Sequence, residues 1–588
     1  MGGTARLFHL ALAAQAIIGV SCLNADIRAD SNRDGIVDVH GSSDTGNKAL
    51  WTPQHGAIFL PNIGDKHRRC TRTDAVGNPW SNDELAACHD ASGHLLLAPE
   101  YVAPLRTVPM NVSDEATAHI YATPSAAYDR VRLFVLDDPS NRNGTASWRL
   151  VDQEFLFNST QLRSGITLGI DGREAVANSS IWDGSTLVRF DVTDGPSRAS
   201  DAVALRMAPV LTHNHLQVVK TLVSTASNSS DPIQMGFVSQ LDEARVEAGI
   251  HEPLLLFNQS SDIWAQDFIE PGYASMPGPN GPISLRVILR SAQSTRTAGR
   301  QVFEQLRGPG IGGVQPASGS GSGFGHREIN SFGNLETIPP YTSKSGVVYK
   351  AGRIIMGKHF QQRPARAMLD FLHAQQAQSP LLLETGWLLI GHVDEFVQFL
   401  PFDNELGFTI SIADTRPALK LLEDLRTDGY GDTQAISFEP PSGMERDEPG
   451  LQSTISEILS NTTFAEANAY AQRHIDANLQ ILLSEIPLDP EDVMHVPTLF
   501  RDAGNAHLMA FYPASINGIV LGHSYLSPKP WGPVVNGTDV LAQAVEAAYA
   551  RAGMSVGYMD DYLSHHVGAG EIHCGSNTLR QTDLVWWE

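Results

Sequence analysis

One cysteine near the carboxyl terminus stands where it could act as a nucleophile. Of the four cysteines in the chain, Cys22 falls in an expected targeting segment, and Cys70 and Cys88 bracket a polar loop in which they could pair in an oxidising compartment. Cys574 is then left as an odd thiol between His573 and a Gly-Ser-Asn turn, where backbone donors and the imidazole could favour the thiolate. A buried, inert cysteine would explain the count equally well.

A histidine and an aspartate follow an apolar run two residues apart. Residues Trp387–Ile390 predict a strand that leads into His392 and Asp394. In an extended segment residues i and i+2 share a face, so the imidazole and the carboxylate would point the same way. Such a pair suits proton transfer beside a cation or at a metal site. Hydrogen bonds within a turn would satisfy the same two groups.

Three further polar side chains follow a tryptophan in the segment Ser261–Tyr273. Gln266, Asp267 and Glu270 come shortly after Trp264, and because Gln266 and Glu270 are four residues apart they could converge on one helical face. Oxygen-only donors favour a hard cation such as calcium. Taken alone, the segment would fit a group of surface acids as well.

An acidic run at the amino terminus predicts a calcium loop. Asp30, Asn32 and Asp34 take positions 1, 3 and 5 of such a loop, and Gly35 takes the sharp turn. Position 12 is Gly41 rather than the bidentate glutamate of an EF-hand, so ligands from elsewhere would complete the site. The predicted ligands are Asp30, Asn32, Asp34, Asp38 and Asp65, with Asp83 as an alternative to Asp65. The competing interpretation is a solvated acidic loop.

The elements that must position these residues change character near residue 212. From Asp26 to about Met207, short apolar runs separated by Gly, Asn, Asp and Pro predict a β-sandwich with strands at Gly56–Pro61, Arg130–Leu136, Ser147–Val151 and Thr186–Val192. Beyond Pro209, strands alternate with helices. The expected strands are Leu285–Leu289, Val347–Met356, Trp387–Ile390 and Gly518–Leu521, and the expected helices are Ala365–Gln376, Pro417–Thr427, Gln452–Ile486 (with a possible break) and Asp539–Gly553. The Gly/Ser-rich stretch Gly308–Gly325 predicts a flexible loop that could cover a site.

Together these segments resemble the protein-arginine deiminases, a family of the guanidino-modifying (pentein) superfamily. The resemblance covers about residues 212–588 and rests on four stretches in the family's order, which are Trp264–Asp267, Ser331–Glu336, Gly391–Phe396 and His573–Asn577. The stretches Asp26–Gly41 and Trp51–Leu60 resemble the family's calcium-binding middle domain. The first domain of the animal enzymes is expected to be absent, because this match begins directly after the targeting segment.

The resemblance implies an α+β chain in which residues 26–211 form an immunoglobulin-like β-sandwich and residues 212–588 form a five-bladed α/β-propeller catalytic domain of the pentein type. It implies calcium-dependent hydrolysis of peptidyl-arginine to peptidyl-citrulline and ammonia, with arginine-containing proteins or peptides as substrates. Cys574 would attack the guanidinium carbon to give a thiouronium intermediate, and His392 would move the protons. The expected clamp on the guanidinium is Asp267 with Asp394, and the expected substrate contacts are Trp264 and Arg296.

The resemblance also assigns calcium ligands in the catalytic part. One site matches Gln266, Glu270 and Glu336 with the backbone carbonyls of Phe332 and Leu335. A neighbouring second site is expected to be lost, because Phe268 stands where the family has an acid and Arg290-Ser291 stands where it has Asp-Ser.

Composition and targeting signals indicate the class of partner and the cellular compartment. A formal charge of −24 over 588 residues argues against a nucleic-acid partner and favours cations or basic peptides. Arg6, the apolar run Leu7–Val20 and a small-residue end at Ala25 predict a secretory signal peptide over residues 1–25, and no later run is long enough to span a membrane. Glycosylation acceptors fit a secreted glycoprotein and lie at Asn111, Asn143, Asn158, Asn178, Asn228, Asn258, Asn461 and Asn536.

Two other functions remain open from the sequence. The first is a deiminase or amidinotransferase that acts on free arginine or agmatine, because the sequence does not reveal whether the cleft admits a chain. The second is a secreted calcium-binding module whose catalytic residues are relics. Against the second, all four expected catalytic residue types are present.

Overall fold

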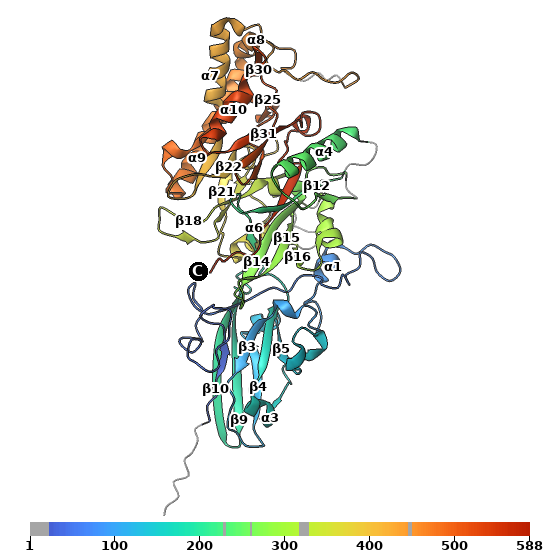
Figure 1. Cartoon of the computed structure of the whole chain (residues 1–588), viewed down its shortest axis with the longest axis vertical. Helices are drawn as coiled ribbons and strands as arrows, with labels where there is room; N and C mark the ends of the chain where they lie inside the picture. Colours follow the sequence, from blue (N-terminus) through green and yellow to red (C-terminus); the bar gives the residue numbers. More distant parts are fainter. Residues whose placement is uncertain are drawn as a thin grey trace, which may run out of the picture.

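The computed structural model describes residues 23–226, 231–258, 261–293, 295–316, 328–444 and 450–587. The chain is elongated, with an amino-terminal β part at one end and a larger mixed part at the other (Figure 1). Most of the predicted signal peptide, the acceptor Asn228 and residues 317–325 of the predicted Gly/Ser-rich loop lie outside the described residues.

The amino-terminal part contains two five-stranded sheets whose buried residues share one apolar core, an arrangement in keeping with the predicted sandwich. Strand β9 (Ser185–Asp194) illustrates how the sequence specifies it. Thr186, Val188, Phe190 and Val192 are buried and the residues between them are partly exposed, as expected for a strand with one face on a core. The four strands predicted for this part all occur.

The strands of the first sheet, in spatial order, are β1 (Ile27–Ala29), β3 (Ala103–Thr107), β8 (Thr167–Gly172), β5 (Val131–Leu136) and β6 (Trp148–Leu150). Those of the second sheet are β2 (Ala57–Phe59), β10 (Ser197–Met207), β9, β4 (Thr117–Thr123) and β7 (Phe157–Asn158). The predicted disulfide between Cys70 and Cys88 is present, with the two Cα atoms 5.7 Å apart.

The larger part contains, among the described residues, five small sheets built to one plan. In each, two strands pair antiparallel and one of these two also pairs parallel with a third. The same three-strand pairing therefore recurs without any fixed sequence period, because only the burial pattern of each strand needs to be kept.

The five sheets, in spatial order, are β13 (Leu255–Phe257), β12 (Val219–Thr225) and β32 (Ser576–Arg580); β11 (Leu211–Thr212), β14 (Ile269–Met276), β15 (Ile283–Arg290) and β16 (Ile311–Val314); β17 (Leu335–Ile338), β20 (Arg353–Lys358) and β21 (Leu381–Glu384); β22 (Val397–Pro401), β23 (Phe408–Asp414) and β24 (Met494–Pro497); and β27 (Ile519–Leu521), β28 (Ser524–Pro528) and β31 (Ser555–Met559). Three hairpins accompany them, formed by β18 (Tyr341–Thr342) with β19 (Val348–Tyr349), β25 (Phe500–Gly504) with β26 (His507–Ala510), and β29 (Val534–Val535) with β30 (Thr538–Asp539).

The helices of the described chain are α1 (Asn82–Ala87), α2 (Ser125–Tyr128), α3 (Ser159–Ser164), α4 (Pro232–Glu247), α5 (Ala265–Phe268), α6 (Arg366–Ala374), α7 (Thr415–Leu425), α8 (Ile455–Ser460), α9 (Thr462–Glu485) and α10 (Val540–Ala550). The expected helices all occur, and the longest is broken where Asn461 ends α8 and caps α9 by accepting from the amide of Phe464. The sequence missed α4, which Asp231 caps and Pro232 begins.

Three sequence expectations are wrong. Residues Trp387–Ile390 form a turn with a single bridge from Leu388 to Leu508 rather than a strand, because Leu388 bonds back to Thr385. The expected strand Val347–Met356 is split by the turn at Gly352. The predicted Gly308–Gly325 loop contains β16, which pairs with β15.

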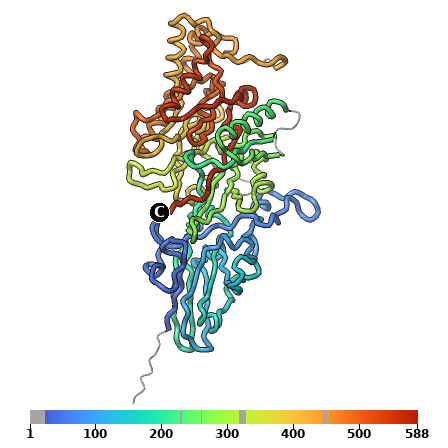
Figure 2. Tube along the Cα trace, in the orientation of Figure 1, coloured from blue at the N-terminus to red at the C-terminus, as the bar shows by residue number. Residues whose placement is uncertain are grey.

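The two ends of the larger part meet in one sheet. Strand β32 near the carboxyl terminus pairs antiparallel with β12, so the segment that carries Cys574 is fixed beside elements more than 300 residues earlier. The carboxyl terminus then runs back to the junction with the sandwich (Figure 2), where Arg33 donates to the carbonyl of Trp587.

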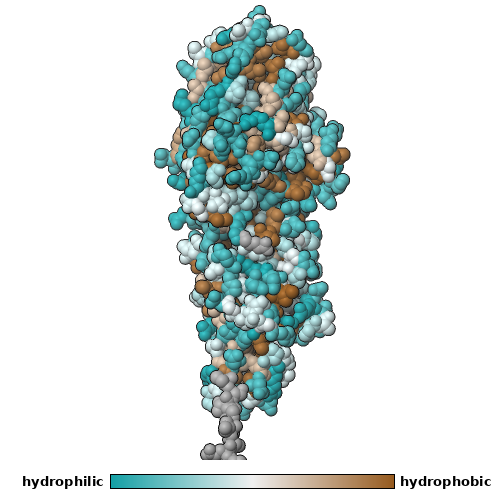
Figure 3. Space-filling model, turned by 60° about the vertical axis from the view of Figure 1, so that its left-hand side comes forward, coloured by the Kyte–Doolittle hydropathy of each residue, from teal (hydrophilic) through white to brown (hydrophobic). Residues whose placement is uncertain are grey.

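None of the helices in the described ranges combines the length and hydropathy needed to cross a bilayer. On the face seen in Figure 3, polar and apolar residues are interspersed along the length of the molecule.

Candidate active site

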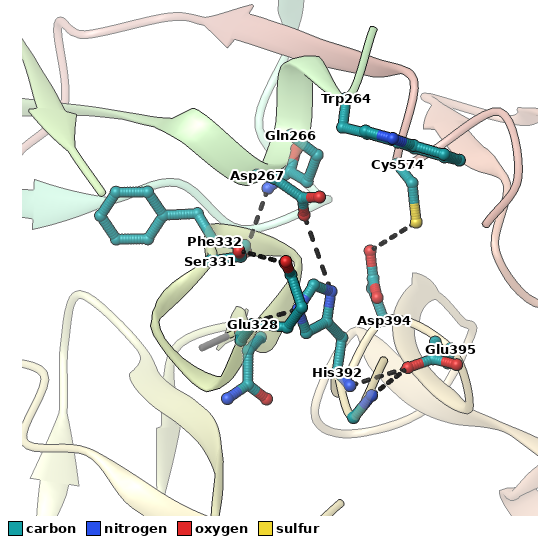
Figure 4. Close-up of polar contacts among 12 residues, drawn as sticks. Trp264, Gln266, Asp267, Glu328, Ser331, Phe332, His392, Asp394, Glu395 and Cys574 are labelled. Atoms are coloured by element: carbon teal, nitrogen blue, oxygen red, sulfur yellow. Dashed lines mark hydrogen bonds and ion pairs between the residues drawn. The ribbon is translucent and has the colours of Figure 1, made fainter. Parts of the chain in front are cut away.

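The four predicted catalytic residues come from three segments that the fold brings together at one place (Figure 4). Asp267 lies on the short helix α5, His392 and Asp394 lie in the turn before β22, and Cys574 lies just before β32. Backbone hydrogen bonds join the segments: the amide of Gln266 donates to the carbonyl of Cys574, and the amide of Asp394 donates to the carbonyl of Gly333.

Gly333 marks the point on which three of these side chains converge. A β-carbon added there would lie 2.5 Å from His392 Nδ1, 3.0 Å from an Asp267 carboxylate oxygen and 3.1 Å from an Asp394 carboxylate oxygen. The predicted common direction of His392 and Asp394 is therefore correct, although the segment is a turn rather than a strand. Two carboxylates and one imidazole therefore pack directly against the backbone of Gly333.

The thiol of Cys574 faces the same carboxylates. Its Sγ lies 3.6 Å from Asp394 Oδ2 and 3.4 Å from Asn517 Oδ1. Asn517 also donates from its side-chain amide to the carbonyl of Asp394, so it joins the two catalytic segments. Asn517 could not be identified from the sequence, because a single asparagine after a turn has no spacing to distinguish it.

The expectation of a readily formed thiolate is not met by these surroundings. Burial, followed by the nearby carboxylates of Asp394 and Asp267, raises the pKa of the Cys574 thiol well above its ordinary value. The imidazole of His573, which was expected to favour the thiolate, is hydrogen-bonded through Nδ1 to Asp394 Oδ2 at 2.9 Å. A cation placed between the two carboxylates would lower the pKa of this thiol.

His392 is fully buried and surrounded by acids. Its Nε2 lies 3.0 Å from the carbonyl oxygen of Glu328, and its Nδ1 lies 3.6 Å from Asp267 Oδ1. Burial by itself would lower the pKa of this imidazole, but Asp267, Asp394 and the neighbouring Glu395 raise it above the ordinary value. The raised pKa favours the protonated imidazole, the form that a proton donor requires.

Arg296 contacts the carboxylate of Asp267 directly. Its Nη2 lies 2.7 Å from Asp267 Oδ2 and 2.7 Å from Glu328 Oε2, and its Nη1 lies 3.1 Å from Asp262 Oδ1. The guanidinium of Arg296 thus occupies one side of the carboxylate predicted to hold a substrate guanidinium. Its predicted contact with substrate backbone stays a prediction. Glu328, which links Arg296 and His392, is a second residue that the sequence did not reveal.

Trp264 lies beside the thiol, as Figure 4 shows. Its ring packs over Gly568 and Gly570, where added β-carbons would lie 3.0 Å and 2.5 Å from indole atoms. The ring of His565 holds it edge-on, with 5.0 Å between ring centroids. The indole is partly exposed and forms an apolar wall next to the nucleophile.

The calcium ligands predicted for the catalytic part lie close together. Gln266 Nε2 lies 3.2 Å from Glu270 Oε2 and 3.3 Å from the carbonyl oxygen of Phe332. Glu270 is on strand β14 rather than on the helix of Gln266, so the convergence is correct but its expected helical basis is wrong. Burial, and then the charge of Glu336, raises the pKa of Glu270 well above its ordinary value. Two buried carboxyls that repel each other beside an amide and a carbonyl fit a hard cation. Leu335 begins strand β17 next to Glu336.

The position of the second predicted calcium site is filled by apolar and cationic groups. Phe268 is buried and packs edge-on against Phe257, with 5.0 Å between ring centroids. The amide of Ser291 donates to the carbonyl of Phe268, and the buried Arg290 next to it donates to Gln315.

The amino-terminal acidic loop keeps part of its predicted ligand set. Asp30 is buried, accepts from the amide of Gly35 and keeps its Oδ1 without a partner. Burial, with the charges of Asp44 and Asp34, raises the pKa of Asp30 to about 7. Asn32 donates to Asp34 beside it. The sequence did not reveal Asp44, a fully buried carboxylate that accepts from the amides of residues 31, 32 and 38.

Two of the other predicted ligands of this loop are engaged elsewhere. Asp65 accepts from the amides of Arg69 and Cys70, and so caps its own turn rather than completing the loop at Asp30. Asp83, the alternative, accepts from Gln315. Asp38 accepts from the amides of residues 40 and 41. Hydrogen bonds within their own turns therefore satisfy the carboxylates of Asp65 and Asp38, and the spacing of these residues along the sequence could not reveal this.

Comparison with known proteins agrees with the residue pattern. The family model described as protein-arginine deiminase (PAD) matches residues 197–588. Human protein-arginine deiminase type-1 is 33% identical over 404 residues, covering 66% of this chain and 57% of the relative. Mouse protein-arginine deiminase type-3 is 28% identical over 603 aligned residues, covering 98% of this chain and 84% of the relative. This chain spans about half the length of the human type-1 and type-4 proteins.

Among solved structures, one described as a putative peptidyl-arginine deiminase is similar with 12% identity and a TM-score of 0.37, over 64% of this chain and 100% of that chain. An agmatine deiminase of C. jejuni is similar with 9% identity and a TM-score of 0.34, over 63% of this chain and 96% of that chain. The family model spans the elements that carry Asp267, His392, Asp394 and Cys574. With that match over more than half of its length, the chain belongs to the protein-arginine deiminase family.

Proposed function

We propose that this chain hydrolyses the guanidinium group of peptidyl-arginine to give peptidyl-citrulline and ammonia. The observation that carries the proposal is the convergence of Asp267, His392 and Asp394 on the space beside Gly333, with Cys574 Sγ 3.6 Å from Asp394. Family membership supports the same reaction.

The two carboxylates would recognise the substrate by charge and shape. A guanidinium is a planar cation with five N–H donors that stays protonated in water. Asp267 and Asp394 offer acceptor oxygens on two sides of the space beside Gly333, which suits charge-assisted, bidentate hydrogen bonds. Arg296 would have to move from Asp267 Oδ2, or share the carboxylate, when the substrate binds.

The chemistry would follow from the positions of sulfur and imidazole. The bound cation lowers the pKa of Cys574, and the thiolate attacks the guanidinium carbon, forming a C–S bond. One C–N bond breaks, and the nitrogen leaves as ammonia with a proton from His392. A water molecule then gives a proton to His392 and adds to the same carbon. The new hydroxyl group loses its proton to the departing sulfur as the C–S bond breaks, which releases citrulline and the thiol.

We propose that calcium binds at Gln266, Glu270 and Glu336 with the carbonyls of Phe332 and Leu335, and at the acidic loop of Asp30. When bound, calcium supplies charge that neutralises buried carboxylates and holds their segments in place. In the catalytic part we expect one ion, because Phe268 and Arg290 replace oxygen ligands at the neighbouring position. A crystal soaked in calcium tests this count, and an ion beside Phe268 would contradict it.

The decisive assay measures citrulline formed from a blocked arginine ester and from free arginine, with calcium and with excess chelator. We expect turnover of the blocked ester in calcium only, and little turnover of free arginine. The Cys574→Ser variant should lose several decades of turnover, because an alcohol is a far weaker nucleophile at neutral pH. Preference for free arginine would favour the alternative substrate class, and inactivity toward both substrates would favour a relic binding module. Full activity of Glu270→Ala in chelator would contradict the role of calcium.

The architecture and cellular setting complete the proposal. The five sheets with one pairing plan support a five-bladed propeller, and the two-sheet part supports an immunoglobulin-like sandwich. The disulfide Cys70–Cys88 supports an oxidising compartment, in keeping with the predicted signal peptide. Acceptor residues Asn111, Asn143 and Asn536 are exposed, as glycosylation requires.

A further inference from the structure

Two histidines and a glutamate form a buried cluster next to the active site. His215 lies in the loop between β11 and β12, Glu336 lies on β17, and His573 precedes the nucleophile. His215 Nε2 lies 3.1 Å from Glu336 Oε2, and His573 Nε2 lies 3.4 Å from Glu336 Oε1. One potential ligand atom from each of the three residues lies within 4.8 Å of the others. The catalytic scheme above uses neither imidazole.

We infer that His215, Glu336 and His573 bind a divalent transition metal ion such as Zn²⁺ or Co²⁺. Two imidazole nitrogens and one carboxylate, with a position left for water, are a ligand set that zinc takes in proteins. Bonds of about 2.0 to 2.1 Å in a tetrahedral site separate the donors by roughly 3.3 Å. Each histidine nitrogen lies near that distance from one oxygen of Glu336, His215 from Oε2 and His573 from Oε1. Small side-chain rotations would bring the two histidine nitrogens to the same separation.

The hydrogen bonds around the cluster orient it as a metal site requires. The Nδ1 of His573 bonds to Asp394 Oδ2 at 2.9 Å, which leaves Nε2 directed at Glu336. A carboxylate behind a ligating histidine fixes the ring and raises its basicity as a ligand. Arg580 holds the loop of His215 by donating to the carbonyls of His215 and Gln217 at 3.0 and 2.7 Å.

The charges around the cluster and the chemical type of its ligand atoms determine which metal ion it can bind. The cationic Arg580 opposes any metal, but the carboxylates of Glu270, Glu336 and Asp394 surround the same space. Imidazole nitrogens suit zinc, cobalt and nickel, whereas calcium takes oxygen ligands. The same Glu336 therefore faces two kinds of site, one with oxygen donors at Gln266 and Glu270 and one with nitrogen donors at His215 and His573.

Sharing of Glu336 predicts competition, and this part of the inference rests on the proposed calcium site. A transition metal held by His215 and His573 would withdraw Glu336 from calcium and neutralise charge beside Asp394. Calcium and the transition metal would then exclude each other.

Titration of the chelator-treated full chain with Co²⁺, without calcium, tests the site directly. We expect one ion per chain, the intense visible spectrum of four- or five-coordinate cobalt, and displacement by Zn²⁺. His215→Gln should weaken binding by at least about tenfold. His213→Gln is the matched control, because His213 is equally buried two residues away but stacks on Tyr273 and bonds to Gln217. Its affinity for cobalt should equal that of the wild type, and circular dichroism should show both variants folded.

Equal cobalt affinity in folded His215→Gln and wild type would overturn the inference, leaving an ion pair only. A sulfur-to-cobalt charge-transfer band would overturn it too, because Cys574 would then be the ligand. The Glu270→Ala variant separates the two proposals, since it removes a calcium ligand and keeps the three residues of the cluster. It should bind cobalt like the wild type but no longer release it when calcium is added. If calcium has no effect on cobalt binding even in the wild type, the shared use of Glu336 fails while the transition-metal site stands.

Discussion

At the scale of single residues, burial shifts the charge state of Asp267. Burial raises the pKa of Asp267 to about 6, against the opposing effects of Arg296 and His392. Below that pH the protonated carboxyl no longer offers a negative charge to a guanidinium, so kcat/KM for an arginine ester should fall as the pH drops through about 6. The measurement is a pH–rate profile at saturating calcium, with doubled calcium as the control. A flat profile between about pH 7 and pH 5 would contradict this reading.

The site also depends on the absence of a side chain at Gly333. In Gly333→Ala the new methyl group would enter the space between His392 Nδ1 and the carboxylates of Asp267 and Asp394. We expect kcat/KM to fall at least about 100-fold, because displacements of an ångström at reacting groups have effects of that size. Gly236→Ala, on the exposed side of helix α4 with open space around it, should keep full activity. Near-normal kinetics of folded Gly333→Ala would place substrate elsewhere.

At the scale of elements, the disulfide loop fastens the sandwich to the catalytic part. The loop closed by Cys70 and Cys88 carries helix α1, and Arg307 of the catalytic part donates to the carbonyls of Leu85 and Cys88. Replacing both cysteines by alanine should cost about 3 kcal/mol of stability, as expected for a loop of this length. Urea unfolding with and without reductant measures it. Reductant should lower the midpoint of the wild type but not of the double variant, and an equal midpoint for both proteins without reductant would refute the role.

At the scale of the whole molecule, the acidic loop connects the two parts. Gly35 has a φ of +84°, and a β-carbon there would lie 2.2 Å from the carbonyl oxygen of Gly278 in the catalytic part. Gly77 has a φ of +93° but no neighbouring atoms within 4 Å. Both alanine variants carry the backbone cost of about 1 kcal/mol, but only Gly35→Ala should also separate the parts. Limited proteolysis and Tm measure the difference, and identical behaviour of the two variants would show that the loop does not support the junction.

The sequence alone supplied the candidate residues of this protein, and the tertiary structure decided their geometry. Cys574 and the pair of His392 and Asp394 stood out by residue type and spacing, and the resemblance of their segments to the deiminase family implied their roles and that of Asp267. The sandwich strands and the amphipathic helices were also predictable, since burial of one face imposes a period on the sequence.

The folded chain alone decided which segments distant in sequence come into contact. Asn517 beside the thiol and Glu328 beside His392 have no local pattern, and each acquires its role from a partner more than 50 residues away in sequence. The same holds for the protonated thiol, which results from burial beside two carboxylates more than 170 residues away in sequence. The pairing of β32 with β12 sets these distances, because it fixes the carboxyl-terminal segment against the start of the catalytic part.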